Sequence, residues 1–226
     1  MMGTNFDKVL DELKISSKPK TEYSSIKMEE EIIINILDKY DIKIDSIYDL
    51  IQNRNDYKDI IPILLNILRT DILTNEKVIE GVVRALTIKG AKGLVEEILI
   101  KNYNALSKED KRKSLGWTYG NAIEYLYSDR YVDINEILRI VKNKNNGTSR
   151  QMFVLALGKT KKHIEKVAEV LIELTYDSEV DLHALTALYK LKYIKAAPRI
   201  KELSKSSKIA VRKKSQQFLK KYGVEK

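Results

Sequence analysis

The residues best equipped for molecular recognition lie in the segment 115–121, which reads LGWTYGN. Trp117 is the only tryptophan of the chain, and Asn121 follows four residues later, so on a helix the two side chains share one face. An indole ring offers a broad surface for stacking, and an amide both donates and accepts hydrogen bonds. The pair therefore predicts a binding surface, with burial of Trp117 in the core as the alternative.

The chain has few residues that could bind a metal ion or act as a nucleophile. The chain has no Cys and only two His, His163 in a basic turn and His183 in a predicted helix, and neither has a second His three or four residues away. A zinc site needs such neighbouring ligands. We predict no metal, no cofactor and no catalytic residue. The acidic run Glu29–Glu31 opens a predicted helix, where carboxylates complement the helix dipole.

A phosphate-binding loop is also excluded by spacing. Gly158, Lys159 and Thr160 resemble the end of such a loop, but the motif requires a glycine five residues before Gly158, where Phe153 stands. The segment also ends a predicted helix, whereas the motif opens one. We read it as a turn between helices.

Positive charge is concentrated near the C-terminus. Residues 189–226 contain 13 Lys and Arg against Glu202 and Glu225, a local net charge of +11, so the other 188 residues carry −2 of the total of +9. Such an end attracts an anionic partner: nucleic acid, an acidic protein or anionic lipid. The alternative is a solvated lysine surface that caps the end of the fold.

Several of these cations recur at related positions. Arg150 and Arg212 fall at equivalent places in two predicted helices, and a ladder of cations would suit a nucleic-acid backbone, with binding that depends steeply on salt. No base-reading motif accompanies them. Pairing with Glu on adjacent turns is the alternative reading.

The elements that carry these residues are predicted to be helices, since Gly and Pro are scarce. Residues 5–14 form an amphipathic pattern, and the polar segment 16–25 contains Pro19, so we expect a mobile N-terminal arm and linker over 1–25. Two further helices are predicted over 28–40 and 47–52.

Beyond residue 57 the pattern becomes periodic. The second helix of each predicted pair carries an apolar core centred on Ala85, Ala122, Ala156, Ala187 and Phe218, at spacings of 37, 34, 31 and 31 residues. The first helices are expected over 57–69, 92–103, 133–141, 164–174 and 197–204. Repeats of this length built from two helices are typical of α-solenoids.

The repeats resemble the HEAT family, including its short bacterial form. The clearest match is residues 209–219 (IAVRKKSQQFL), and 177–188 and 149–158 are similar. The resemblance covers about residues 57–222. It implies an all-α fold, an α-solenoid of about five HEAT-like helix pairs with extra N-terminal helices, in a single domain over 26–226.

In such a stack the second helices line a concave groove, and equivalent residues form columns along it. One predicted column is Glu80, Trp117, Gln151, Leu182 and Lys213, and a second is Arg84, Asn121, Leu155, Thr186 and Gln217. We take as candidate groove residues Glu80, Arg84, Trp117, Asn121, Arg150, Gln151, Arg212, Lys213, Lys214 and Gln217.

The function this architecture implies is binding without catalysis: a scaffold that presents its groove to a macromolecular partner, protein first. Nucleic-acid binding through the basic C-terminal repeats is the alternative. A third reading is a resemblance to HEAT-like alkylpurine DNA glycosylases at Trp117, but Asn121 stands where that family places a catalytic Asp.

The sequence shows no pattern typical of a membrane span or a signal peptide. No stretch approaches the ~20 apolar residues of a membrane span, and the N-terminus lacks the apolar core of a signal peptide. We expect a cytoplasmic protein without a membrane span. The heavy use of Ile and Lys is typical of an AT-rich bacterial genome, and the oligomeric state stays open.

Overall fold

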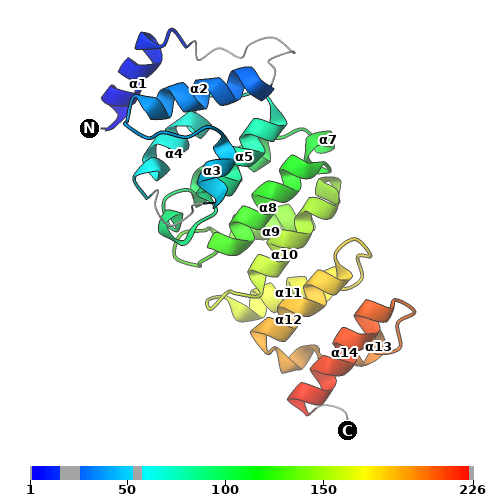
Figure 1. Cartoon of the computed structure of the whole chain (residues 1–226). Helices are drawn as coiled ribbons and strands as arrows, with labels where there is room; N and C mark the ends of the chain where they lie inside the picture. Colours follow the sequence, from blue (N-terminus) through cyan, green and yellow to red (C-terminus); the bar gives the residue numbers. More distant parts are fainter. Residues whose placement is uncertain (1, 16–25, 53–57, 224–226) are drawn as a thin grey trace. The chain divides into compact units, whose positions relative to one another are not determined.

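The computed structural model describes residues 2–15, 26–52 and 58–223, and these residues form α-helices joined by turns and short 3-10 segments (Figure 1). No strand occurs within those ranges. The predicted all-α class is therefore confirmed. The chain divides into two compact units, residues 1–105 and 106–226, and each is described by itself below.

The first unit contains six helices within its described residues. They are α1 (Met2–Glu12), α2 (Ile26–Asp38), α3 (Ile47–Gln52), α4 (Ile61–Arg69), α5 (Glu76–Leu86) and α6 (Glu96–Ala105). Helix α1 packs against α4 and buries Phe6, Val9 and Leu10. The amphipathic helix at the start of the chain is thus confirmed, whereas the predicted linker over 16–25 lies outside the described residues.

Two carboxylates of α2 fix the start of other helices. Glu29 is buried and accepts hydrogen bonds from the backbone N–H of Thr74 at 3.0 Å and of Asn75 at 2.9 Å, next to the start of α5. Glu30 accepts from the backbone N–H of Ile47 at 2.9 Å, at the start of α3. Since the first N–H groups of a helix lack partners inside it, these bonds join α2 to its neighbours. The acidic run thus binds the starts of α3 and α5.

The second unit consists of helix pairs. Its helices are α7 (Lys108–Lys111), α8 (Ser114–Leu126), α9 (Ile134–Lys142), α10 (Arg150–Leu157), α11 (Ile164–Leu174), α12 (Asp181–Leu191), α13 (Ala197–Leu203) and α14 (Ile209–Tyr222). Helix α8 packs on α10, α10 on α12 and α12 on α14, while α9, α11 and α13 each pack on the helix that follows (Figure 1). The short helix α7 was not predicted from the sequence.

Small residues hold the second helices close together. Ala122, Ala156 and Ala187 are buried, as the repeat pattern predicted. At Gly158 a Cβ atom would lie 2.9 Å from the Cα of Ala187, and at Gly120 it would lie 3.1 Å from the Cβ of Met152. A Cβ atom at Gly158 would have to displace the backbone at Ala187, and one at Gly120 would have to push its neighbours by a few tenths of an ångström, because protein interiors are packed to crystal-like density. The backbones of α8, α10 and α12 therefore lie near one another.

The predicted domain division is not tested by these contacts. An arm over 1–25 followed by one domain over 26–226 stays a prediction, since the described contacts define two units without fixing how they are joined.

Candidate functional site

The candidate site is the solvent side of α8, α10 and α12, which we call the second-helix face. On each helix its side chains include residues three or four positions apart, which project to the same side, and an adjacent residue that widens the surface. The exposed or half-buried members are Trp117, Asn121, Glu124 and Tyr125 on α8, Gln151, Met152 and Leu155 on α10 with Lys159 in the turn that follows it, and Leu182, His183, Thr186 and Lys190 on α12. The face combines aromatic, aliphatic and amide groups.

Trp117 and Asn121 both lie on this face. The Trp117 residue is 42% exposed, so burial in the core is excluded, and Asn121 one turn later is half-buried. Tyr125, one further turn along α8, is also exposed. The three side chains follow one stripe of the helix, where a partner can reach them.

An ion-pair cluster lies on the second-helix face near the C-terminal ends of α8 and α12. Glu124 of α8 lies 2.8 Å from the ammonium of Lys159, in the turn after α10, and 3.5 Å from that of Lys190 on α12. One carboxylate thus links α8 to α12 and to the turn after α10.

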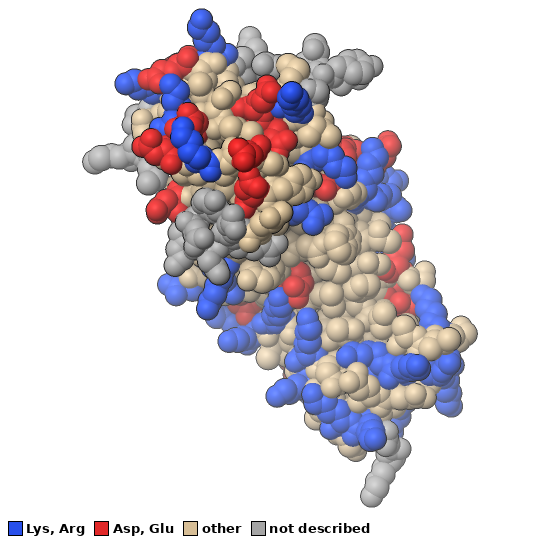
Figure 2. Space-filling model, in the orientation of Figure 1, with Lys and Arg blue, Asp and Glu red and all other residues tan. Residues whose placement is uncertain are grey.

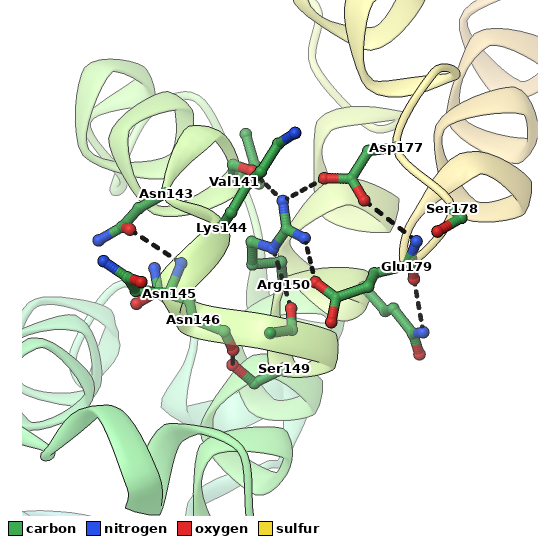
Figure 3. Close-up of polar contacts among 12 residues, drawn as sticks. Val141, Asn143, Lys144, Asn145, Asn146, Ser149, Arg150, Asp177, Ser178 and Glu179 are labelled. Carbon is green, nitrogen blue, oxygen red and sulfur yellow. Dashed lines mark hydrogen bonds and ion pairs between the residues drawn. The ribbon is translucent and has the colours of Figure 1, made fainter.

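Arg150 corrects the sequence-based expectation. We expected it on the groove surface, but its side chain is 0% exposed and lies between α10 and the loop before α12 (Figure 3). Its Nη1 lies 2.9 Å from Asp177 Oδ2, and its Nη2 lies 2.7 Å from Glu179 Oε2. A guanidinium can satisfy several acceptors at once, which makes it the cation best suited to such burial. Arg150 is a structural residue.

Two backbone carbonyls complete the shell around the guanidinium. Nε donates to the carbonyl of Gly147 at 2.9 Å, and Nη1 also donates to the carbonyl of Val141 at 3.1 Å (Figure 3). Gly147 has a φ of 59°, a left-handed value that favours glycine. The side chain thus joins the end of α9, the turn after it and the following pair of helices.

The contacts around Arg150 change the pKa of the Asp177 carboxyl. Burial is the largest single influence and would raise the pKa of its carboxyl, but hydrogen bonds from the Arg150 guanidinium and the backbone N–H of Glu179, together with the positive charges of Arg150 and Lys144, outweigh it, so the pKa lies below its ordinary value. The ionised form is therefore favoured in the folded protein.

A pH dependence of stability follows from the lowered pKa of Asp177. We expect wild type to exceed Asp177→Asn in unfolding free energy at pH 7, because the carboxylate is then ionised and bound by Arg150. The difference should shrink as the pH falls below the unfolded-state pKa of about 3.9 and through the lower folded-state value. Urea unfolding of both proteins at pH 7, 5, 4 and 3 measures it. A difference that stays constant with pH would contradict the assignment.

Gln151 and Arg212 are held by the backbone. Gln151 Nε2 donates to the carbonyl of Glu179 at 2.8 Å, so this half-buried amide is fixed at the edge of the second-helix face. Arg212 is half-buried, and its Nη1 donates to the carbonyl of Ser206 at 2.6 Å. Neither is a freely available charge or amide.

The other predicted residues of α14 reach solvent. Lys213 and Gln217 are exposed, and Lys214 is half-buried. The Lys214 ammonium lies 4.0 Å from the ring centroid of Tyr189 on α12 and 3.1 Å from Gln217 Oε1. Tyr189 was not a predicted site residue. Only the packing of α12 against α14 reveals it, because the two residues are 25 positions apart in the sequence.

Glu80 and Arg84 belong to the first unit, on α5. The Glu80 side chain is buried, with carboxylate oxygens 3.7 Å from the Lys77 ammonium and 3.8 Å from Arg84 Nη2. Arg84 is exposed. Glu80 is therefore not a surface residue, contrary to its predicted place in the groove column, because its side chain turns into the packing around α5.

Among the described residues, no group of three or more His, Asp or Glu is placed to hold a metal ion. His183 is half-buried and has its pKa lowered by that burial. None of the described helices has the length and apolar character required to cross a bilayer.

Comparison with known proteins adds no relative: no protein-family model, no curated protein and no solved structure matches this chain. The function is therefore argued from the residues themselves.

Proposed function

We propose that this chain is a non-enzymatic binding protein, built as a HEAT-like α-solenoid, whose second-helix face holds a macromolecular partner, most simply another protein. The stacking of α8, α10, α12 and α14, each paired with a first helix or turn, supports the solenoid reading. A cytoplasmic location and a bacterial origin are parts of the same proposal, and the bacterial origin rests on composition alone.

The observation that carries the proposal is the exposure of Trp117 beside partly exposed aliphatic side chains. Met152 and Leu155 on α10 and Leu182 on α12 are half-buried on the same face. The tan surface over α8 and α10 in Figure 2 shows how little charge interrupts this region. Aromatic anchors among apolar neighbours are typical of the energetic centre of protein interfaces.

Enzymatic activity of the glycosylase type finds less support. A carboxylate is needed near the aromatic surface to stabilise a positively charged sugar, and the residue one turn after Trp117 is the neutral amide Asn121. Glu124, the nearby carboxylate on α8, is engaged by Lys159 and Lys190. The face is better suited to holding a partner than to catalysis.

A site-specific crosslinking experiment tests the proposal. A photoreactive amino acid at Asn121 or Thr186 should capture the same partner in cells, whereas one at Glu169, exposed on the first helix α11, should not. With that partner purified, Trp117→Ala should weaken binding at least tenfold, because interface tryptophans often contribute about 2 kcal/mol or more.

The matched control is Tyr176→Ala, which removes another exposed aromatic ring of the same unit but lies after α11, off the second-helix face. Its affinity should stay within twofold of wild type. Equal capture from positions 121 and 169, or equal loss in both alanine variants, would refute the assignment of the face.

A further inference from the structure

The C-terminal end of the second unit carries far more positive charge than its own contacts use. The described residues 189–223 include twelve Lys and Arg and a single acidic residue, Glu202. Figure 2 shows the result at the lower end of the view, where blue side chains gather with no red among them on the face drawn. An unbalanced surface of this kind attracts polyanions.

About half of these cations already have partners. Lys190, Lys195, Arg199 and Lys208 each lie within 4 Å of a carboxylate, and Arg212 is bound to backbone carbonyls. These side chains stabilise the helix pairs. The charge that is left for a ligand must therefore be found elsewhere.

Helix α14 supplies it through four lysines. Lys213, Lys214, Lys220 and Lys221 form two adjacent pairs seven residues apart, so they lie on one side of the helix, about 10 Å apart along its axis. None of the four forms an ion pair with a described carboxylate, and α14 itself contains no Asp or Glu. We call these four residues the lysine face.

Two tyrosine rings hold part of the lysine face in place. The ammonium groups of Lys214 and Lys221 lie 4.0 Å and 4.6 Å from the ring centroid of Tyr189. Tyr222 packs against Tyr189 with ring centroids 5.7 Å apart and donates its hydroxyl to the Tyr189 carbonyl at 2.9 Å. Attraction between a cation and an aromatic face restrains a flexible lysine. Two of the four charges are thereby ordered before any ligand arrives.

We infer that the lysine face binds the phosphate backbone of a nucleic acid without reading its sequence. Lysine ammonium groups serve as point charges for phosphate, and evenly spaced cations match a polymer with a charge on every residue. The exposed residues between the two lysine pairs are Gln216 and Gln217. This stretch offers no exposed apolar anchor for a membrane or a protein interface, so the contact is electrostatic.

This inference goes beyond the proposed function and uses other residues. Protein binding depends on Trp117 and its neighbours on α8, α10 and α12, whereas phosphate binding depends on α14 and Tyr189. Each can fail while the other holds, and Trp117→Ala should leave nucleic-acid affinity unchanged.

The test is fluorescence anisotropy of a labelled 20-nucleotide oligo(dT) with the full chain, titrated at several salt concentrations. If four phosphate contacts form, the slope of log affinity against log salt should be about −3, since each contact with a single strand contributes about −0.7. Replacing all four lysines by Gln should lower affinity at least tenfold at low salt. It should also bring the slope of log affinity against log salt from about −3 close to zero.

Controls separate a site from net charge. A control quadruple variant removes the same charge from four exposed lysines outside α14, and it should change affinity less than threefold. Its Gln substitutions are at Lys142, Lys161, Lys162 and Lys166. Tyr189→Leu keeps every charge and an apolar side chain, and should weaken binding a few-fold because Lys214 and Lys221 lose their ring. Urea midpoints report whether each variant is folded. The double variant Lys213→Gln/Lys220→Gln removes no lysine that lies over a ring. It should reduce the salt slope by about half as much as the quadruple variant does.

Three results would overturn the inference. One is no binding by wild type at 50 mM salt, and another is an equal loss in the control quadruple variant. The third is binding of poly-glutamate peptide or anionic vesicles, but not of oligonucleotide, with the same dependence on the four lysines. In that last case the lysine face is an acidic-protein or lipid site.

Discussion

Replacing Arg150 by Ala is expected to lower the free energy of unfolding by about 3–5 kcal/mol, the usual effect of removing one partner from a buried ion pair. The side chain is fully buried, and Asp177 opposite it is only 12% exposed. Without the guanidinium, that carboxylate and the carbonyls of Val141 and Gly147 lose a donor that water reaches poorly. A charge left unpaired under these conditions is costly.

The loss should appear in urea unfolding as a lower midpoint with an unchanged slope, since the native fold buries the same surface. Arg139→Ala is the matched control. Arg139 also contacts a carboxylate at 2.7 Å, that of Glu136, but its side chain is 63% exposed, so its removal should change stability by less than about 1 kcal/mol. Similar losses in the two variants would mean that the Arg150 network is not a buried clamp.

A conservative variant sharpens the same prediction. Arg150→Lys keeps the charge, but an ammonium cannot replace the planar fork that contacts Asp177 and Glu179 while donating to two carbonyls. Its stability should fall between those of wild type and Arg150→Ala. Equality with wild type would show that only the charge matters.

Arg150 also shows where sequence reasoning ends. Its position at the start of a second helix was predicted, but the direction of its side chain was not, because the acceptors come from residues up to 29 positions away and meet only in the folded chain. A charged residue at a helix start is most often solvated, so the pattern favoured a surface role. The nearby acidic residues Asp177 and Glu179 were present in the sequence, but their distance from Arg150 could not be read from it.

The helices themselves were more predictable, since their signal is local. The apolar periodicity placed the segments now seen as α9, α11 and α13 within a few residues, and the recurring Ala marked the buried side of the second helices. Such patterns depend on spacing within one helix. The site was predictable only in part: Trp117 could be placed on a helix face, whereas the ring of Tyr189 under Lys214 depends on how two helices pack.

The second large effect is expected at Gly158, at the end of α10. Its backbone has φ −66° and ψ −7°, a helical conformation in which Ala would normally be the more stable residue by about 0.4–1 kcal/mol. A Cβ atom there would, however, lie 2.9 Å from the Cα and 3.2 Å from the carbonyl oxygen of Ala187. Gly158→Ala should therefore destabilise the protein by about 1–3 kcal/mol, with a larger loss for Gly158→Val, because α10 must move away from α12.

The sign of the stability change in Gly158→Ala tests the packing. If the end of α10 were open to solvent, Gly158→Ala would stabilise the protein. Ala210→Val, at an exposed position on α14, controls for adding methyl groups to a helix and should change stability by less than about 0.5 kcal/mol. A double-mutant cycle with Ala187→Gly then identifies the atoms in conflict. Because the blocked atoms of Ala187 belong to its backbone, removing its methyl group should not rescue Gly158→Ala, and the two losses should add. A rescue would place the conflict in side chains and would mean that the backbones of α10 and α12 lie farther apart than these contacts require.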